Sequence, residues 1–241
     1  FILVGPEIFK MEYLMNFTVV LIFRKKLPQF NSIEEIFFNL HEEFKKHISV
    51  TKVEMPCAGA GWKDILSNLK YSRENKSGLT HITGHINYVS LATGRNTILT
   101  VHDIGSALQG SFLHKSLIKM FWFWMPALLV KKITVISETS RRELISIIPF
   151  AKNKTVVVHN PVNSKLKFAP KVFNSQNPLI LHIGTKPNKN LGKTIAALRG
   201  IKCRLLVIGT LSEEQLQLLQ VHKINYRNIK HVPFAKIKAA Y

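Results

Sequence analysis

Acidic side chains are scarce in this sequence. It holds 14 Asp and Glu residues against 34 Lys and Arg, which gives a formal net charge of +20, and its only aspartates are Asp64 and Asp103. A field this positive favours partners that carry phosphate, and nucleic acid, anionic lipid headgroups and sugar nucleotides all qualify. Because the basic residues are spread along the chain, charge alone does not choose among these partners.

Cysteine and long apolar runs are also lacking. Cys57 and Cys203 are the only cysteines, and no CxxC pair or histidine cluster accompanies them. This argues against a disulfide framework or a zinc site and favours a reducing cytoplasm. No stretch reaches the ~20 uninterrupted apolar residues of a membrane-spanning helix. The nearest one, residues 116–130, is broken by Lys119 and Pro126.

The first residues do not have the composition of a signal peptide. Residues 1–14 open with an apolar run but have no basic segment before it. The chain begins with Phe1, whereas Met15 stands directly before a predicted strand. We therefore expect the first domain to start at Met15, and residues 1–14 to be a leader that the native product can lose.

From residue 16 onward, short runs of β-branched and aromatic residues alternate with amphipathic segments. Strands are predicted at residues 16–23, 50–55, 97–101, 132–136 and 154–158, and helices at 32–46, 62–71, 113–130 and 138–147. Residues 159–178 lose this periodicity and are rich in Asn, Pro, Lys and Ser, which is typical of a linker. A second cycle has strands at 179–184 and 203–209 and helices at 189–198 and 213–222. The alternation predicts an α/β fold with parallel sheets, in two Rossmann-like domains at 15–160 and 178–241 joined by a linker at 161–177.

Ligands of such sheets bind beyond the carboxyl ends of the strands. His102 stands at a strand end, where it can face a cleft or serve no function. Ser137 follows another strand and is equally well interpreted as a helix cap. Residues 184–190 combine a strand end, Gly184, Lys186, Lys189 and a helix start, an arrangement suited to a diphosphate; a solvated basic loop is the alternative. Neither a GxGxxG fingerprint nor a P-loop is present, so no nicotinamide cofactor or ATP hydrolysis is indicated.

Five segments in order and spacing resemble glycosyltransferase family 4, of the bacterial group 1 type. They are ILTVHDIG (98–105), ITVISETSRREL (133–144), VVVHNPVN (156–163), LILHIGTKPNKNLGKTIAAL (179–198) and CRLLVIG (203–209). The likeness is closest to bacterial members with FRK and SIEEIF early in the first domain and HITGH before the TVHD strand. It runs from about residue 16 to the last residue.

The resemblance implies a GT-B fold of two Rossmann-like domains, here with the second one incomplete. Members transfer a sugar from a nucleotide diphosphate sugar to an acceptor hydroxyl, usually with retention of configuration and without a metal or other cofactor. The absence of a DxD motif fits this expectation. His102 matches the family histidine near the transferred sugar, and Lys189 matches the lysine that grips the donor diphosphate. The usual arginine is replaced by Asn188 in a loop one residue shorter, so we expect Lys186 to supply the missing charge.

The resemblance also implies roles for the other candidate residues. Donor and phosphate binding is expected at Gly184, Thr185, Lys186, Asn188, Lys189, Asn190 and Gly209. The acceptor side or cleft is expected at Arg24, Lys25, Asp103, Ser137 and Glu138. The expected partners are a nucleotide sugar and a sugar or lipid-linked acceptor, with no nucleic acid, and the expected role is a hexosyltransferase-like step in surface polysaccharide or other glycoconjugate synthesis.

The expected location is cytoplasmic, and peripheral contact with the cytoplasmic face of a membrane is compatible with it. Residues 114–132, with Trp122, Trp124 and flanking lysines, have a composition that also fits a membrane surface. The interpretation that we favour is a helix whose aromatic face packs on the first sheet.

Two further hypotheses remain from the sequence. The family's EGFG-type segment and downstream Glu do not occur before Tyr241, so the second domain is expected to hold about two βα units and the chain as given not to catalyse transfer. A non-enzymatic remnant folded in its first domain only is therefore one alternative. A basic nucleic-acid-binding protein is the other, supported by charge but by no recognised module.

Overall fold

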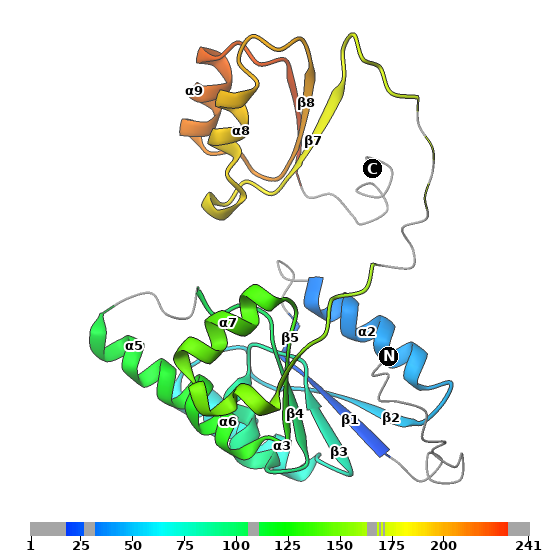
Figure 1. Cartoon of the computed structure of the whole chain (residues 1–241), viewed down its shortest axis with the longest axis vertical. Helices are drawn as coiled ribbons and strands as arrows, with labels where there is room; N and C mark the ends of the chain where they lie inside the picture. Colours follow the sequence, from blue (N-terminus) through cyan, green and yellow to red (C-terminus); the bar gives the residue numbers. More distant parts are fainter. Residues whose placement is uncertain are drawn as a thin grey trace. The chain divides into compact units, whose positions relative to one another are not determined.

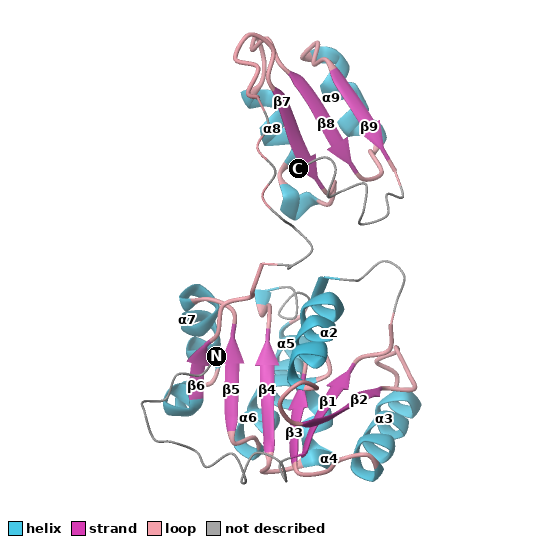
Figure 2. Cartoon of the chain, turned by 90° about the vertical axis from the view of Figure 1, so that its right-hand side faces the viewer, coloured by secondary structure: helices cyan, strands magenta, loops and turns pink. Residues whose placement is uncertain are grey.

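The computed structural model describes residues 18–26, 32–105, 111–162, 168, 170 and 172–230. The chain divides into two compact units, Phe1–Asn163 and Ser164–Tyr241. Each unit is built on its own parallel sheet (Figures 1 and 2). The predicted leader, residues 1–14, lies outside the described residues, as does much of the predicted linker.

The first unit contains a six-stranded sheet in the order β2-β1-β3-β4-β5-β6, and every neighbouring pair is parallel. The strands are β1 (Thr18–Phe23), β2 (Ser49–Glu54), β3 (Leu79–Ile82), β4 (Thr97–Val101), β5 (Lys132–Val135) and β6 (Thr155–Val157). The helices are α2 (Ser32–Phe44), α3 (Trp62–Glu74), α4 (Ser90–Thr93), α5 (Phe112–Ile118), α6 (Met125–Leu129) and α7 (Glu138–Ile147). Short 3-10 helices cover Asn87–Val89 and Pro149–Lys154, and a π-helix, η3, covers Lys119–Trp124.

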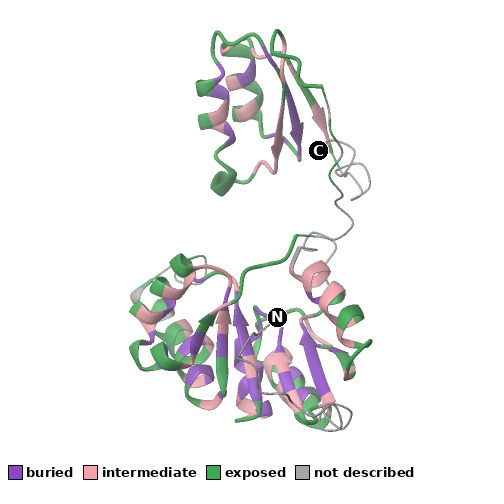
Figure 3. Ribbon diagram, turned by 45° about the vertical axis from the view of Figure 1, so that its right-hand side comes forward, coloured by how far each residue is buried: buried purple, intermediate pink, exposed green. Residues whose placement is uncertain are grey.

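Helices cover both faces of this sheet, and β1 shows why. Its residues from Val19 to Phe23 are all apolar and all buried (Figure 3). Alternate side chains of a strand point to opposite faces. Val20 and Ile22 therefore join one core cluster with residues of α6 and α7, whereas Val19, Leu21 and Phe23 pack with Phe37 of α2 in another. A strand buried on both faces reads as a continuous apolar run, as parallel sheets require.

The second unit contains a three-stranded parallel sheet in the order β7-β8-β9. Its elements are β7 (Leu179–Ile183), the 3-10 helix η5 (Pro187–Lys189), α8 (Leu191–Ala197), β8 (Arg204–Ile208), α9 (Glu213–Val221) and β9 (Tyr226–Ile229). Helices α8 and α9 lie against the same face of this sheet (Figures 1 and 2). Leu191 and Ile195 of α8, Leu205 and Val207 of β8, and Leu219 of α9 form its core.

The predicted α/β architecture is confirmed, with two strands added. β3 and β9 are not among the predicted strands, since each carries polar residues where a strand pattern has apolar ones. Thr80 of β3 is nevertheless only 2% exposed. In β9, the Asn228 side chain donates to the carbonyl oxygens of Val207 and Gly209, at 3.1 and 2.8 Å. Tertiary contacts of this kind override the weak intrinsic preference of a short strand.

The predicted helix at 113–130 is a composite of α5, η3 and α6. The Met125 amide bonds to the carbonyl of Met120, five residues back, so the π-helix turn ends directly before Pro126. Within the described residues, no helix combines the length and apolar character needed to cross a membrane.

Candidate functional site

The strand order of the first sheet fixes one candidate position. The chain adds β2 on one side of β1 and β3 on the other, so the order reverses between β1 and β3. Ligands of open parallel sheets bind beyond the carboxyl ends of the strands at such a switch point. Arg24 follows β1 there, Thr83 follows β3 and His102 follows β4. These residues make this edge the first candidate site.

An ion pair at this edge connects β1 to α2. Arg24 Nε lies 2.5 Å from Glu34 Oε1, and the two side chains are only 18% and 14% exposed. Glu34 stands in the first turn of α2, where the positive end of the helix dipole stabilises a carboxylate. Its other oxygen, Oε2, is buried and has no hydrogen-bond partner among the described residues. Buried polar atoms are rarely left without a partner, so this oxygen is suited to accept a hydrogen bond from a ligand.

Three histidines gather beside this ion pair. The ring of His102 stacks on that of His85, with centroids 6.3 Å apart, and meets the edge of Phe37 at 5.9 Å. Phe37 also contacts His81, at 5.2 Å between centroids. His81 Nε2 lies 2.8 Å from the hydroxyl of Thr100. The cluster therefore joins the ends of β3 and β4 to α2.

All three imidazoles are held in the neutral form. Burial, together with a smaller effect of the neighbouring His102, lowers the pKa of His81 to about 4. Burial also lowers the pKa values of His85 and His102, and the Arg24 guanidinium adds to both effects. At neutral pH these rings therefore act as hydrogen-bonding groups and not as cations.

The hydrogen bond of His102 fixes its tautomer. Its Nε2 lies 2.9 Å from the Thr83 carbonyl oxygen, which can only accept. In a neutral ring the proton must then sit on Nε2, which leaves Nδ1 with a free lone pair. Nδ1 can accept a hydrogen bond from a substrate hydroxyl.

The depressed pKa of His81 predicts a loss of stability in acid. The unfolded chain takes up a proton near pH 6.5 and the folded chain only near pH 4, so stability falls as the pH drops through this window. Between pH 7 and pH 5 the expected loss from His81 is about 2 kcal/mol. Urea unfolding across this range should show a shallower pH dependence in His81→Gln than in the wild type. The exposed His47→Gln variant should retain the wild-type slope, and equal slopes in all three proteins would contradict the assignment.

A glycine leaves the space that the His102 ring occupies. Gly84 has φ 123°, and a Cβ on it would lie 2.6 Å from His102 Cδ2 and 3.1 Å from Nε2. Gly84→Ala is expected to cost about 2 kcal/mol through backbone strain and displacement of the ring. Gly94→Ala is the matched control, because Gly94 has φ 76° but no atom within 4 Å of its Cβ position. It should cost about 1 kcal/mol and leave the NMR signals of His102 unmoved. Equal losses and unmoved signals in both variants would show that the ring does not depend on Gly84.

The other predicted residues of the first unit have partners of their own. Lys25 Nζ donates to the Pro56 carbonyl at 2.8 Å, and Asp103 Oδ1 accepts from the Gly105 amide at 3.0 Å. Ser137 caps α7, because its Oγ accepts from the Ser140 amide at 3.1 Å. The neighbouring Glu138 is exposed and lies 3.9 Å from Arg141. The helix-cap interpretation of Ser137 is thus confirmed, and Arg24 and His102 are the predicted residues that share one cluster.

In the second unit, glycines end two neighbouring strands. Gly184 follows β7 with φ 89° and Gly209 follows β8 with φ 138°, values that favour glycine. The Gly184 amide donates to the Ile208 carbonyl at 2.8 Å. A Cβ on Gly209 would lie 3.0 Å from Cγ2 of Thr185. The close approach of these two loops therefore depends on a glycine at position 209.

Side-chain hydrogen bonds hold these loops together. The Thr185 hydroxyl donates to the Thr210 carbonyl at 2.6 Å. Gln215 of α9 donates from Nε2 to the Thr185 carbonyl at 2.8 Å. Thr185 thus positions the loop and is not free to bind a ligand through its hydroxyl hydrogen. These two bonds connect the loop after β7 to the loop after β8 and to α9.

The predicted phosphate loop carries its lysines in an exposed turn. Lys186, Asn188 and Lys189 are exposed, and Asn190 adopts the left-handed conformation with φ 58° directly before α8. Helix α8 begins at Leu191, later than predicted, so Lys189 belongs to the 3-10 turn and not to the helix. The methylene chain of Lys189 lies over Gly184, whose Cβ position is 3.0 Å from Lys189 Cγ. The lysine stem and the glycine turn therefore form one unit.

A half-buried histidine stands in β7, directly before this loop. His182 Nδ1 lies 3.4 Å from the Thr194 hydroxyl, and its Nε2 is buried with no hydrogen-bond partner among the described residues. Burial lowers the pKa of His182, and Lys189 adds to the effect. A neutral ring next to the lysine leaves the positive charge of the loop to Lys186 and Lys189.

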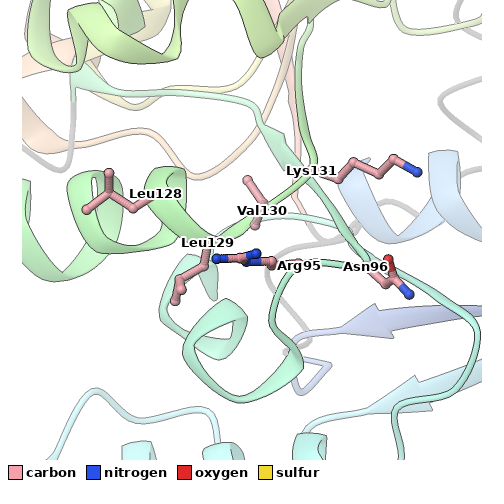
Figure 4. Close-up of a pocket in the computed structure, with 6 residues that line it drawn as sticks. All are labelled: Arg95, Asn96, Leu128, Leu129, Val130 and Lys131. Atoms are coloured by element: carbon pink, nitrogen blue, oxygen red, sulfur yellow. The ribbon is translucent and has the colours of Figure 1, made fainter.

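The first unit also has an open pocket of about 420 Å³ (Figure 4). It is lined by Arg95, Asn96, Leu128, Leu129, Val130 and Lys131. Arg95 and Asn96 precede β4, and Lys131 precedes β5, so the pocket stands at the amino ends of these strands. None of the predicted site residues lines it.

The sequence patterns do not single out Glu34 and Gln215, whereas Thr83 and His85 belong to residues 81–85, which are among the polar groups expected at strand ends. Glu34 stands beside Glu35 in a helix start, and its pairing with Arg24 depends on a contact between residues ten positions apart. His85 follows β3, a strand that the patterns do not predict. The run HITGH was the available signal for His85, and nothing local marks Gln215.

No family model matches the chain, and no curated protein matches its sequence. Solved structures do match. The Anabaena protein HepE (Alr3699), in complex with UDP and glucose, aligns with a TM-score of 0.58 at 13% identity, over 90% of this chain and 70% of that one. A glycosyltransferase from Rickettsia africae aligns with a TM-score of 0.53 at 14% identity, over 90% and 68%.

AviGT4, a glycosyltransferase involved in avilamycin A biosynthesis, also aligns, with a TM-score of 0.53 at 12% identity, over 92% of this chain and 66% of that one. Identities this low show a shared fold and nothing finer. The chain thus has the α/β fold of GT-B glycosyltransferases, as predicted.

Proposed function

We propose that this chain carries the donor-side and acceptor-side groups of a glycosyltransferase, an enzyme that moves a sugar from a nucleotide diphosphate sugar to an acceptor hydroxyl. The observation that carries the proposal is the loop of residues 184–190 at the carboxyl end of β7, in which the Lys189 side chain lies over Gly184 and Lys186 stands in the same exposed turn. The fold shared with HepE, which binds UDP and glucose, supports the same class of donor.

The donor diphosphate is assigned to this loop. Lys189 and Lys186 supply charge, and Gly184 and Gly209 let backbone approach the phosphates closely. Departure of the nucleotide builds negative charge on its β-phosphate. Fixed cationic groups stabilise that charge more in the transition state than in the ground state, which is what accelerates the reaction. Asn188 and Asn190 add polar groups at the same turn.

His102 is assigned to the transfer step. As a neutral ring with a free Nδ1, it is suited to accept a hydrogen bond from a sugar hydroxyl. Glu34 Oε2, buried and without a partner among the described residues, offers a second acceptor at the same edge. Arg24, Lys25 and Asp103 border this edge and are assigned to the acceptor side.

The finer parts of the proposal rest on the family 4 resemblance. They are retention of configuration, independence of a metal or other cofactor, a sugar or lipid-linked acceptor, and a role in surface polysaccharide synthesis. The two cysteines are free thiols, which supports the proposed cytoplasmic location.

Nucleotide binding tests the proposal directly. Calorimetric titration of the chain with UDP, GDP and UDP-glucose should give saturable binding to at least one of them. A short duplex DNA serves as the competing ligand, because a basic nucleic-acid-binding protein would bind it with an affinity that falls steeply with salt. Salt-sensitive DNA binding together with no binding of any nucleotide diphosphate would overturn the proposal in favour of the nucleic-acid alternative.

A further inference from the structure

The helical segment α5-η3-α6 is apolar on two sides. On the inner side, Phe123 is only 3% exposed, and Ala127 is fully buried in the core of the first unit. The Trp122 ring packs on Tyr88, with centroids 5.0 Å apart, and its indole N–H donates to the His85 carbonyl at 3.2 Å. Packing of this aromatic side on the first unit, the interpretation favoured from the sequence, is thus confirmed for Trp122 and Phe123.

The outer side carries a second apolar set, which we call the outward row. It consists of Leu117, Met120, Phe121, Trp124 and Leu128, which recur at intervals of three and four residues and so share one face of the helix. Their exposed fractions run from 40% for Phe121 to 64% for Leu128. The outer side of a surface helix is normally polar. A contiguous apolar face in its place is typical of an interaction surface.

Two aromatic contacts hold part of the row in place. The Trp124 indole N–H donates to the Ile147 carbonyl at 2.9 Å. Its ring meets that of Phe150 edge-on, with centroids 5.4 Å apart, and Phe150 is itself 44% exposed. The row is therefore presented as a fixed surface that extends beyond the helix.

Basic residues are frequent in the part of the chain that carries the row. Between residues 111 and 162 the chain has eight Lys and Arg and two Glu. The pocket at the end of α6 combines apolar and basic side chains, because Leu128 lines it together with Arg95 and Lys131 (Figure 4). Lys115 and Lys119 are exposed near the other end of the segment.

We propose that the outward row docks peripherally on an anionic lipid bilayer. Apolar and aromatic side chains of a surface helix enter the boundary between headgroups and acyl chains, while Arg95 and Lys131 bind lipid phosphate. The net charge of +20 favours an anionic surface over a second copy of this chain, because two such copies would repel each other. Nucleic acid would satisfy the charge but would leave the outward row exposed to water.

Vesicle co-sedimentation of the full chain is the test. Vesicles of phosphatidylcholine alone are compared with vesicles that also contain phosphatidylglycerol, without any nucleotide, so the outcome is independent of the proposed transferase function. Binding is expected only with the anionic lipid. Phe121→Glu combined with Leu128→Glu should lower the partition coefficient at least tenfold, since each side chain loses its apolar burial. Arg95→Gln combined with Lys131→Gln should lower it by about fivefold for each charge removed.

Matched variants on the second unit separate this effect from a general change of charge. Leu216→Glu combined with Val221→Glu adds the same charge on the exposed side of α9, and Arg199→Gln combined with Lys202→Gln removes two exposed charges. Both should bind vesicles nearly as the wild type does, and circular dichroism should show that all variants are folded. Binding that is unchanged in the Phe121/Leu128 variant, or equal losses in the matched variants, would overturn the proposal. The proposal would also be overturned if the wild-type chain bound no vesicles but formed a dimer that the Phe121/Leu128 variant does not form.

Discussion

Replacing Lys189 by alanine is expected to weaken the binding of UDP or GDP by roughly ten- to a hundredfold, the range for losing a hydrogen bond to a charged group. The lysine stem lies over Gly184, so the turn holds the side chain near the backbone that would face a diphosphate. Calorimetric titration of the wild type and of Lys189→Ala measures the effect. The nucleotide affinity of the variant should also depend less steeply on salt concentration than that of the wild type, because one phosphate contact is lost.

Lys202→Ala is the control for this variant. Lys202 is equally exposed and belongs to the same unit, but it stands before the amino end of β8, away from the glycine-lined loops. Its removal changes the net charge by the same amount and should leave nucleotide affinity within twofold of the wild type, as expected for an exposed charge outside the site. Equal affinities of all three proteins for the nucleotide would remove Lys189 from the site.

In a protein with both GT-B domains complete, replacing His102 by alanine is expected to lower the turnover of sugar transfer by roughly a hundredfold, a typical loss for a positioned hydrogen-bonding group at a reacting centre. The measurement is initial-rate transfer with a panel of sugar nucleotides. Stability should change little. Removing the bond to the Thr83 carbonyl costs about 1 kcal/mol, a shift in melting temperature of a few degrees for a domain of this size.

The exposed histidine at position 47 provides the matched substitution. His47→Ala removes the same side chain from the turn that follows α2, where it is 69% exposed, and should preserve both turnover and melting temperature. A His102→Ala variant that unfolds many degrees below the wild type, with activity reduced only in proportion to the folded fraction, would show that His102 supports the core and not the reaction.

The sequence predicts best where one element carries a strong pattern of its own. β1 is an apolar run and β4 a run of β-branched and apolar residues, both of the length that a buried parallel strand needs, so both strands and the positions of Arg24 and His102 after them follow directly. α7 is bounded by Ser137, whose cap is visible in the sequence and present in the structure. The patterns do not predict β3, since the burial of its Thr80 and the contact of its His81 with Thr100 depend on the neighbouring strands.

The composition of the candidate sites is less predictable than their location. Strand ends locate the two edges, but the partners of His102 come from elements that are distant in the sequence. Phe37 and Glu34 belong to α2, and His85 follows β3. The loop that carries Lys189 follows from the pattern of strand, glycine and lysine. Its connection to Thr210 and Gln215 requires the position of α9, which no local signal gives.

The π turn of Lys119–Trp124 makes this helix sensitive to chain length. It accommodates one residue more than an α-helical turn, since the Met125 amide reaches back five residues instead of four. Deleting Phe121 would let the segment continue as a regular α-helix, and its two flanks would keep their relative orientation, because the π turn already absorbs the extra residue. One more residue inserted before Lys119 would not be absorbed. Side chains on one flank of the insertion would then turn by about 100° relative to those on the other. Phe123 and Ala127 are fixed in the core, so α5 would do the turning, and Leu117 would leave the line of Trp124 and Leu128. The alignment of the exposed side chains along this helix thus depends on the length of the segment as well as on its composition.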